Sequence, residues 1–146
     1  MAKILWLDND RVFPKIYILG LIHEGHEVKH ALSLSEAIKE LDSDKYDLLI
    51  LDVMMTVRDD EQDLFPDGAT NHGQKAGLVF YKEFKERLEN DNVSLLVLTI
   101  RSDSEIREAF TVAGLPSKNF ASKPEVARAE VFLARVAEII GERQKQ

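Results

Sequence analysis

The chain has 146 residues, which suits one globular domain and is too short for two domains with large separate cores. Its formal net charge of −7 would repel phosphate-rich partners such as nucleic acid or anionic lipid. The absence of cysteine excludes disulfides, thiol catalysis and cysteine-ligated metal. No apolar run is long enough for a membrane span or a signal peptide. We therefore expect a cytoplasmic protein with no nucleic-acid or membrane partner.

Short apolar runs, rich in branched residues, alternate with amphipathic stretches along the whole chain. Pro14 suits a first helical turn, Gly25, Gly114 and Gly141 suit helix stops, and Ser33 with Glu36 has the spacing of a capping box. In chain order the predicted elements are strand 4–7, helix 12–24, strand 27–31, helix 33–41, strand 47–52, helix 78–88, strand 95–99, a helix opened by Ser102–Glu105 and ended by Gly114, strand 120–122 and helix 126–140.

Five successive strand–helix units predict an α/β fold. Strands that alternate with helices run parallel and are joined by right-handed crossovers, so the helices cover both faces of the sheet. The runs 47–52 and 95–99 are apolar on both faces, as central strands of such a sheet are. We expect one domain over residues 1–146, a doubly wound five-stranded parallel sheet. Its one irregularity is a long polar segment at about residues 56–76, with a net charge of −3.

Polar side chains follow the strands at the positions where a ligand should bind. Ligands of open parallel sheets lie outside the carboxyl ends of the strands. Asp8, Asn9 and Asp10 follow the first strand, Asp52 ends the third, Thr99 ends the fourth, and Lys123 follows the fifth. If the strand predictions hold, all of these side chains converge at one edge of the sheet.

Such a set of side chains suits phosphoryl transfer to an aspartate. Clustered carboxylates repel one another unless a hard cation lies among them, and oxygen ligands with few protein donors suit Mg²⁺. A carboxylate beside Mg²⁺ can attack phosphorus to form an acyl phosphate. Lys123 and Thr99 would supply an ammonium and a hydroxyl to the charge of the transferred group.

The arrangement resembles the receiver domain of two-component response regulators, over about residues 3–141. The motifs that carry the resemblance are Ile4–Asp10, Leu48–Met55, Val97–Thr99 and Ser122–Pro124. The resemblance implies the flavodoxin-like strand order 2-1-3-4-5. It also implies a receiver that takes a phosphoryl group from a histidine kinase or phosphotransfer protein and then contacts a downstream protein target.

The same resemblance assigns roles to individual residues. Asp52 is the phosphoacceptor, Asp8 and Asn9 hold the positions of the acidic pair that binds Mg²⁺, and the backbone carbonyl of Met54 is a further metal ligand. Thr99 is the switch hydroxyl and Lys123 contacts the phosphoryl group. Phe120 holds the position of the aromatic switch residue, which rotates inward as the hydroxyl moves. The resemblance also allows a cis bond between Lys123 and Pro124.

The sequence departs from the receiver pattern in four ways. Asn9 replaces an acid and brings no charge, so we expect weaker Mg²⁺ binding, for which Asp10 is a candidate compensation. Thr56 stands where the family usually has proline. Ile100 follows Thr99 where a small residue is usual, and a branched side chain there should crowd an attacking water or a bulky donor. The segment 56–76 is much longer than in the family; a lid, a partner surface, disorder and a plain solvated loop are all open.

Two alternatives stay open. A degenerate receiver would dock partners without phosphorylation, as Asn9, Ile100 and the long segment suggest. A phosphatase of the haloacid-dehalogenase type would use Asp8 as nucleophile and Asp10 as acid and base, but this interpretation leaves Asp52 unexplained. The identity of the phosphorylated aspartate separates these hypotheses. Because only five residues follow Gly141, we expect a stand-alone receiver without a DNA-binding or catalytic domain.

Overall fold

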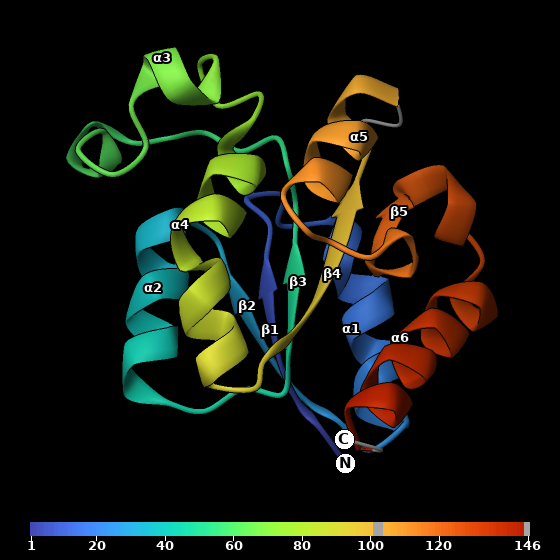
Figure 1. The fold of residues 1–146 in the computed structure, drawn as a ribbon. Coiled ribbons are helices and arrows are strands. Elements are labelled where there is room, and N and C mark those ends of the chain that lie inside the picture. The colour runs from blue at the N-terminus through green and yellow to red at the C-terminus, as the bar shows by residue number, and fades with distance from the viewer. Residues whose placement is uncertain (101–103, 145–146) are drawn as a thin grey trace.

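A five-stranded parallel sheet with helices on both faces forms the molecule (Figure 1). The structure is a computed structural model and describes residues 1–100 and 104–144. The strands are β1 (Lys3–Leu7), β2 (Glu27–Ala31), β3 (Leu48–Leu51), β4 (Ser94–Thr99) and β5 (Phe120–Ser122). The α-helices are α1 (Phe13–His23), α2 (Leu34–Ser43), α3 (Asp67–Thr70), α4 (Ala76–Asn90), α5 (Ser104–Val112) and α6 (Ala129–Gln144). The strand order is β2-β1-β3-β4-β5, which confirms the predicted fold class and order.

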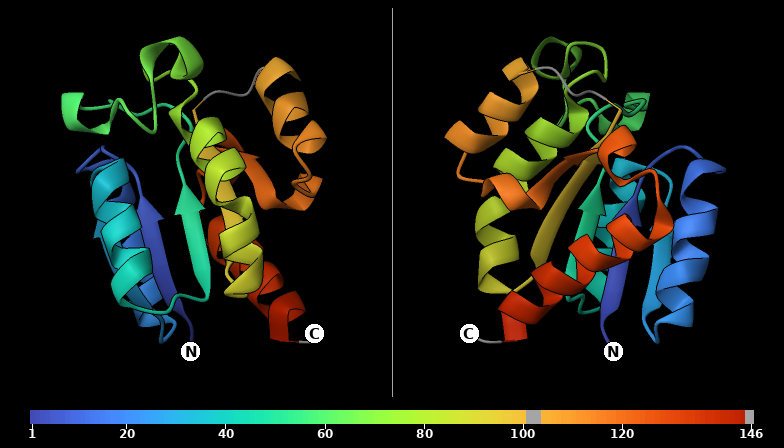
Figure 2. Two further views of the ribbon diagram at one scale, coloured as in Figure 1. Left: turned by 60° about the vertical axis from the view of Figure 1, so that its left-hand side comes forward. Right: turned by 90° about the vertical axis from the view of Figure 1, so that its right-hand side faces the viewer.

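Alternate residues of the central strands point into two separate cores. On one face, β1 and β3 contribute Leu5 and Leu49 to a cluster with α2, α4 and α5. On the other face, Trp6 and Ile50 pack with α1 and α6. Figure 2 shows the two helical layers from the sides. Since both faces of these strands are covered, both sets of alternate residues must be apolar, as the sequence pattern indicates.

The helix ends on the amino-terminal half follow the predicted signals. The hydroxyl of Ser33 accepts a hydrogen bond from the backbone N–H of Glu36 at 3.2 Å, which caps α2. Pro14 lies in the first turn of α1, and Gly25 follows its end with φ of +93°. A left-handed backbone is easy for glycine and costly for other residues, so the stop at Gly25 has a physical cause. The proposed capping residues Ser102 and Asp103 lie outside the described residues.

The carboxyl-terminal helix differs from its prediction. The chain first forms a 3₁₀ turn over Lys123–Val126, and α6 begins only at Ala129. Gly141 does not end the helix, because α6 continues to Gln144. The last turns are held by burial of Ile140 and by an ion pair between Lys118 and Glu142, which outweigh the small helical cost of one glycine. No peptide bond among the described residues is cis, so the cis bond allowed before Pro124 is absent.

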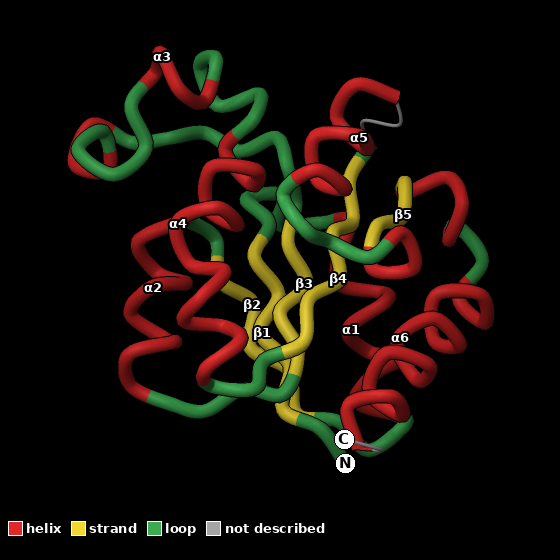
Figure 3. Tube along the Cα trace, viewed as in Figure 1, coloured by secondary structure: helices red, strands yellow, loops and turns green. Residues whose placement is uncertain are grey.

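The segment 56–76, here called the insertion, forms an arch beyond the carboxyl ends of the strands (Figure 3). It contains a 3₁₀ turn, Asp59–Glu61, and the short helix α3. Phe65 is buried and its ring stacks on Phe80 of α4, with ring centroids 6.1 Å apart. The insertion therefore packs against the domain and contributes to one of its cores. Among the described residues, no helix has the length and apolar character needed to cross a bilayer.

Candidate functional site

Two carboxylates and one ammonium meet where β1, β3 and β5 end. Asp8 follows β1, Asp52 follows β3 and Lys123 follows β5. The Lys123 Nζ lies 3.2 Å from Oδ2 of Asp8 and 3.5 Å from Oδ2 of Asp52. All three residues are buried, Asp8 with 1% and Asp52 with 6% of its surface exposed. The parallel topology thus brings together three side chains that are far apart in the sequence.

The negative charge in this pocket exceeds the positive charge. Burial, and then the neighbouring charge of Asp8, raise the pKa of Asp52 to about 7, although Lys123 and the backbone N–H of Val53 oppose the rise. That N–H donates to Oδ1 of Asp52 at 2.8 Å. Asp8 Oδ1 accepts the backbone N–H of Asp10 at 2.9 Å. A single lysine therefore does not balance two buried carboxylates, and a second cation would relieve their repulsion.

Asn9 and Asp10 lie at the exposed rim of the pocket. The side-chain amide of Asn9 donates to Oγ1 of Thr56 at 3.2 Å. Oδ1 of Asp10 accepts the backbone N–H groups of Val12 and Phe13, at 2.8 and 3.2 Å, and so stabilises the turn that leads into α1. These hydrogen bonds lower the pKa of Asp10. Its carboxylate therefore has a structural role, whereas the predicted compensation for Asn9 stays a prediction.

Thr99 and Phe120 lie in the two adjacent strands β4 and β5. Thr99 is fully buried and pairs in register with Ser122, next to Lys123. Phe120 is also buried, with its ring 5.5 Å from that of Phe110 and 4.6 Å from the guanidinium of Arg107. Ile100, the next residue after Thr99, has 62% of its surface exposed. The side chain of Ile100 is thus free of the core, at the end of the strand that carries Thr99.

Two glycines, Gly73 and Gly77, shape the loop that follows Asp52, and neither was among the predicted site residues. The N–H of Gly77 donates to the carbonyl of Val53 at 2.9 Å, and the N–H of Met55 donates to the carbonyl of Gly73 at 3.0 Å. A Cβ atom on Gly77 would lie only 2.2 Å from the carbonyl oxygen of Asp52. Gly73 has φ of +90° and follows two left-handed residues, Asn71 and His72. The Asn-His-Gly run was an available signal for this turn, since Asn and Gly favour that backbone.

The chemistry of the pocket fits a hard divalent cation. Asp8 and Asp52 supply carboxylate oxygens, and the half-buried Met54 lies on the loop directly after Asp52. Among the described residues, no group of three or more acidic or histidine side chains is arranged as a metal site. Mg²⁺ commonly binds through one or two carboxylates and several waters, so two carboxylates suffice for it. The uncompensated charge at Asp52 favours this assignment.

The fold matches solved receiver domains over nearly the whole chain. A CheY-like response regulator receiver domain protein from Methanospirillum hungatei JF-1 gives a TM-score of 0.74 at 18% identity, covering 99% of this chain and 98% of that one. A two-component response regulator from Clostridium difficile gives 0.72 at 19% identity, with 100% of both chains covered.

A further match carries a phosphorylated residue. It is a response regulator protein from Burkholderia pseudomallei with a phosphorylated aspartic acid, a calcium ion and citrate. The TM-score is 0.69 at 21% identity, and the match covers 99% of this chain and 72% of that chain. No family model and no curated protein matches the chain in sequence. At these identities the likeness establishes the receiver-domain fold.

Proposed function

We propose that this chain is a response regulator receiver, one domain with the insertion at 56–76, that accepts a phosphoryl group on Asp52. The observation that carries the proposal is the position of Lys123, within 3.5 Å of both Asp52 and Asp8 at the carboxyl ends of the strands. In such a pocket a carboxylate can act as the nucleophile, and the lysine ammonium can stabilise the charge that develops on the phosphoryl group.

In this mechanism, Asp8 and Asp52, with the carbonyl of Met54 and Asn9 at the rim, would hold Mg²⁺. The metal ion would neutralise charge on the transferred group and lower the pKa of Asp52, so that its carboxylate is ionised at neutral pH. Oδ2 of Asp52 attacks phosphorus, and the bond from phosphorus to the donor nitrogen or oxygen breaks. Lys123 and Thr99 then contact the phosphoryl oxygens.

The added charge would shift the protein between two surfaces. Thr99 and Lys123 lie at the ends of β4 and β5, so movement toward a phosphoryl group would be transmitted to the α5–β5–α6 side of the molecule. Phe120, between Arg107 and the core, is the candidate aromatic switch. The donor would be a histidine kinase or phosphotransfer protein in the cytoplasm, and the output would be a contact with a downstream protein.

The test is phosphorylation by acetyl phosphate with Mg²⁺, followed by mass spectrometry and mapping of the modified residue. We expect one phosphoryl group per chain, on Asp52, and no labelling of Asp52→Asn. Asp91→Asn is the matched control, because Asp91 is an exposed acid at the end of α4, outside the pocket, and it should still be labelled.

Other outcomes would support the alternatives. Phosphate on Asp8 would favour the phosphatase hypothesis. No labelling, together with an amide NMR spectrum that beryllofluoride and Mg²⁺ leave unchanged, would favour a receiver that docks partners without phosphorylation.

A further inference from the structure

The insertion and helix α2 form a groove that none of Asp8, Asp52 and Lys123 lines. Its volume is about 420 Å³. The lining is contributed by α2 (Ser35, Ile38, Lys39, Asp42) and by the segment from Asp60 to Phe65. Nothing in the proposed phosphorylation uses this groove, and it exists only because the insertion turns back onto α2.

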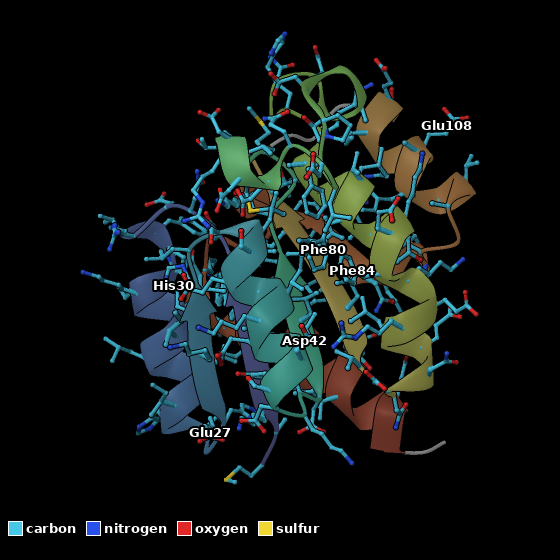
Figure 4. The ribbon with its side chains drawn as sticks, turned by 90° about the vertical axis from the view of Figure 1, so that its left-hand side faces the viewer. Glu27, His30, Asp42, Phe80, Phe84 and Glu108 are labelled. Carbon is cyan, nitrogen blue, oxygen red and sulfur yellow. The ribbon has the colours of Figure 1, made fainter. Side chains whose placement is uncertain are left out.

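The groove is preformed, because the insertion is fastened to the domain on both sides of it. The buried carboxylate of Glu61 accepts the backbone N–H of Ser35 at 2.6 Å, the hydroxyl of Ser35, and the backbone N–H of Arg58 at 2.8 Å. Phe65 stacks on Phe80, which stacks on Phe84. Figure 4 labels Phe80 and Phe84, between α2 and α4. Binding of a partner would therefore cost little conformational entropy in the groove itself.

Apolar side chains form part of the groove surface. Leu64 lines the groove and has 52% of its surface exposed, although the next residue, Phe65, is buried. Ile38 of α2 lies half-buried against the core and also lines the groove. Leu64 and Ile38 thus give this concavity an apolar floor on which an apolar side chain of a ligand could pack.

The rim of the groove is acidic. Among the residues that line it, Asp42, Asp60 and Asp63 are exposed acids and Lys39 is an exposed base. Arg87 pairs with Asp42 at 2.8 Å and Arg58 with Asp60 at 3.4 Å, but Asp63 forms no ion pair among the described residues. The negative charge of the rim adds to the overall charge of −7. The acids Asp42, Asp60, Glu61 and Asp63 against the bases Lys39, Arg58 and Arg87 leave a net charge of −1 around the groove, of the same sign as the whole chain. Charge complementarity therefore favours a positively charged partner over a second copy of this acidic chain.

We propose that this groove binds a basic amphipathic segment of a partner protein, with large apolar side chains on Leu64 and Ile38 and with Lys or Arg on the acidic rim. The proposal does not depend on phosphorylation of Asp52. A short helix presenting apolar residues at i, i+3 and i+4, flanked by basic residues, satisfies both the floor and the rim.

The test uses a fluorescein-labelled 14-residue peptide of Leu, Ala and Lys, with Leu on one helical face and Lys beside it. Fluorescence anisotropy should show saturable binding, with Kd on the order of 100 µM, that weakens as salt is raised. Amide chemical shifts should move in α2 and residues 58–65. A peptide with Glu in place of Lys should not bind.

Variants assign the binding to the groove. Leu64→Asp should weaken binding by about tenfold, and Asp60→Asn with Asp63→Asn by about threefold. Leu19→Asp, at a leucine of α1 with 65% exposure, and Glu108→Gln, at an exposed acid of α5, are the matched controls and should bind as the wild type does.

Three outcomes would overturn the proposal. They are binding that Leu64→Asp leaves unchanged, chemical-shift changes centred on α1, and concentration-dependent shifts of the groove residues without peptide. The last outcome would assign the groove to a second copy of the chain. Circular dichroism of Leu64→Asp verifies folding, and the exposure of this side chain makes unfolding unexpected.

Discussion

At the scale of single residues, two like charges repel each other in the pocket formed by Asp8, Asp52 and Lys123. Asp52 and Asp8 are buried next to each other, and Lys123 lies on one side of both. Burial and the charge of Asp8 together raise the pKa of Asp52 to about 7. A pocket in which one ammonium faces two carboxylates gains more stability from a second cation, or from replacing one carboxylate by a neutral group, than a charge-balanced pocket would.

We therefore predict that Asp52→Asn stabilises the protein in metal-free buffer at pH 7.5, by on the order of 1–2 kcal/mol. The amide removes one of two like charges and keeps most of the shape. Urea unfolding of both proteins with a chelator present measures the difference, and added Mg²⁺ should stabilise only the wild type. A loss of stability would show that the ion pair with Lys123 outweighs the repulsion.

Gly77 offers a second prediction at this scale. Gly77→Ala should destabilise the protein by about 3 kcal/mol, because its Cβ would meet the backbone of Asp52 and Val53 at 2.2 and 2.7 Å. Gly141→Ala is the matched control, since nothing lies within 4 Å of a Cβ there, and it should stabilise α6 by about 0.5–1 kcal/mol. Denaturant unfolding measures both, and equal effects would contradict this account.

At the scale of elements, the insertion is an acidic segment that is held against α2 by one of its own acids, Glu61. Burial alone would raise the pKa of Glu61, but the hydrogen bonds from Ser35 and Arg58 outweigh it and hold the pKa below its ordinary value. A carboxyl group with a lowered pKa stabilises the fold above its ordinary pKa, and this stabilisation is lost as the pH falls through the lowered value.

We predict that Glu61→Gln loosens the insertion without unfolding the sheet. Amide hydrogen exchange over residues 58–65 should accelerate about tenfold, while the amides of β1 and β3 keep their protection. In the wild type, acidification should loosen the same residues progressively as the pH falls below the ordinary pKa of a glutamate and through the lowered pKa of Glu61, after correction for intrinsic exchange rates, and it should add little in Glu61→Gln. Asp60→Asn, at an exposed acid, is the control; loosening of equal size there would contradict the role of Glu61.

At the scale of the whole molecule, the strands and the convergence of the pocket residues could be predicted from local sequence patterns. Runs such as 47–52 are apolar on both faces, and in a parallel sheet such runs place Asp8, Asp52 and Lys123 at one edge. The form of the insertion could not be predicted, because it depends on distant contacts, Glu61 with Ser35 and Phe65 with Phe80. Of the interpretations left open for segment 56–76, a plain solvated loop does not describe Glu61, which is buried.

The predicted ends of helices were wrong where tertiary contacts override a local sequence signal. Gly141 is a stop signal by residue type, yet the burial of Ile140 and the Lys118–Glu142 ion pair continue α6 past it. The start of α6 was placed at residue 126, where Ser122 and Glu125 instead close a 3₁₀ turn. The prediction of the site residues is not affected by such errors, because it depends on where strands end and not on where helices end.

The pairing of Met55 with Gly73 has a consequence for protein engineering. The two residues are hydrogen-bonded neighbours, so everything between them leaves and rejoins the domain at a single point. A short turn could bridge that point and excise the arch, with the sheet edge left in place. Such a deletion would uncover Phe80, so a polar replacement there would have to accompany it.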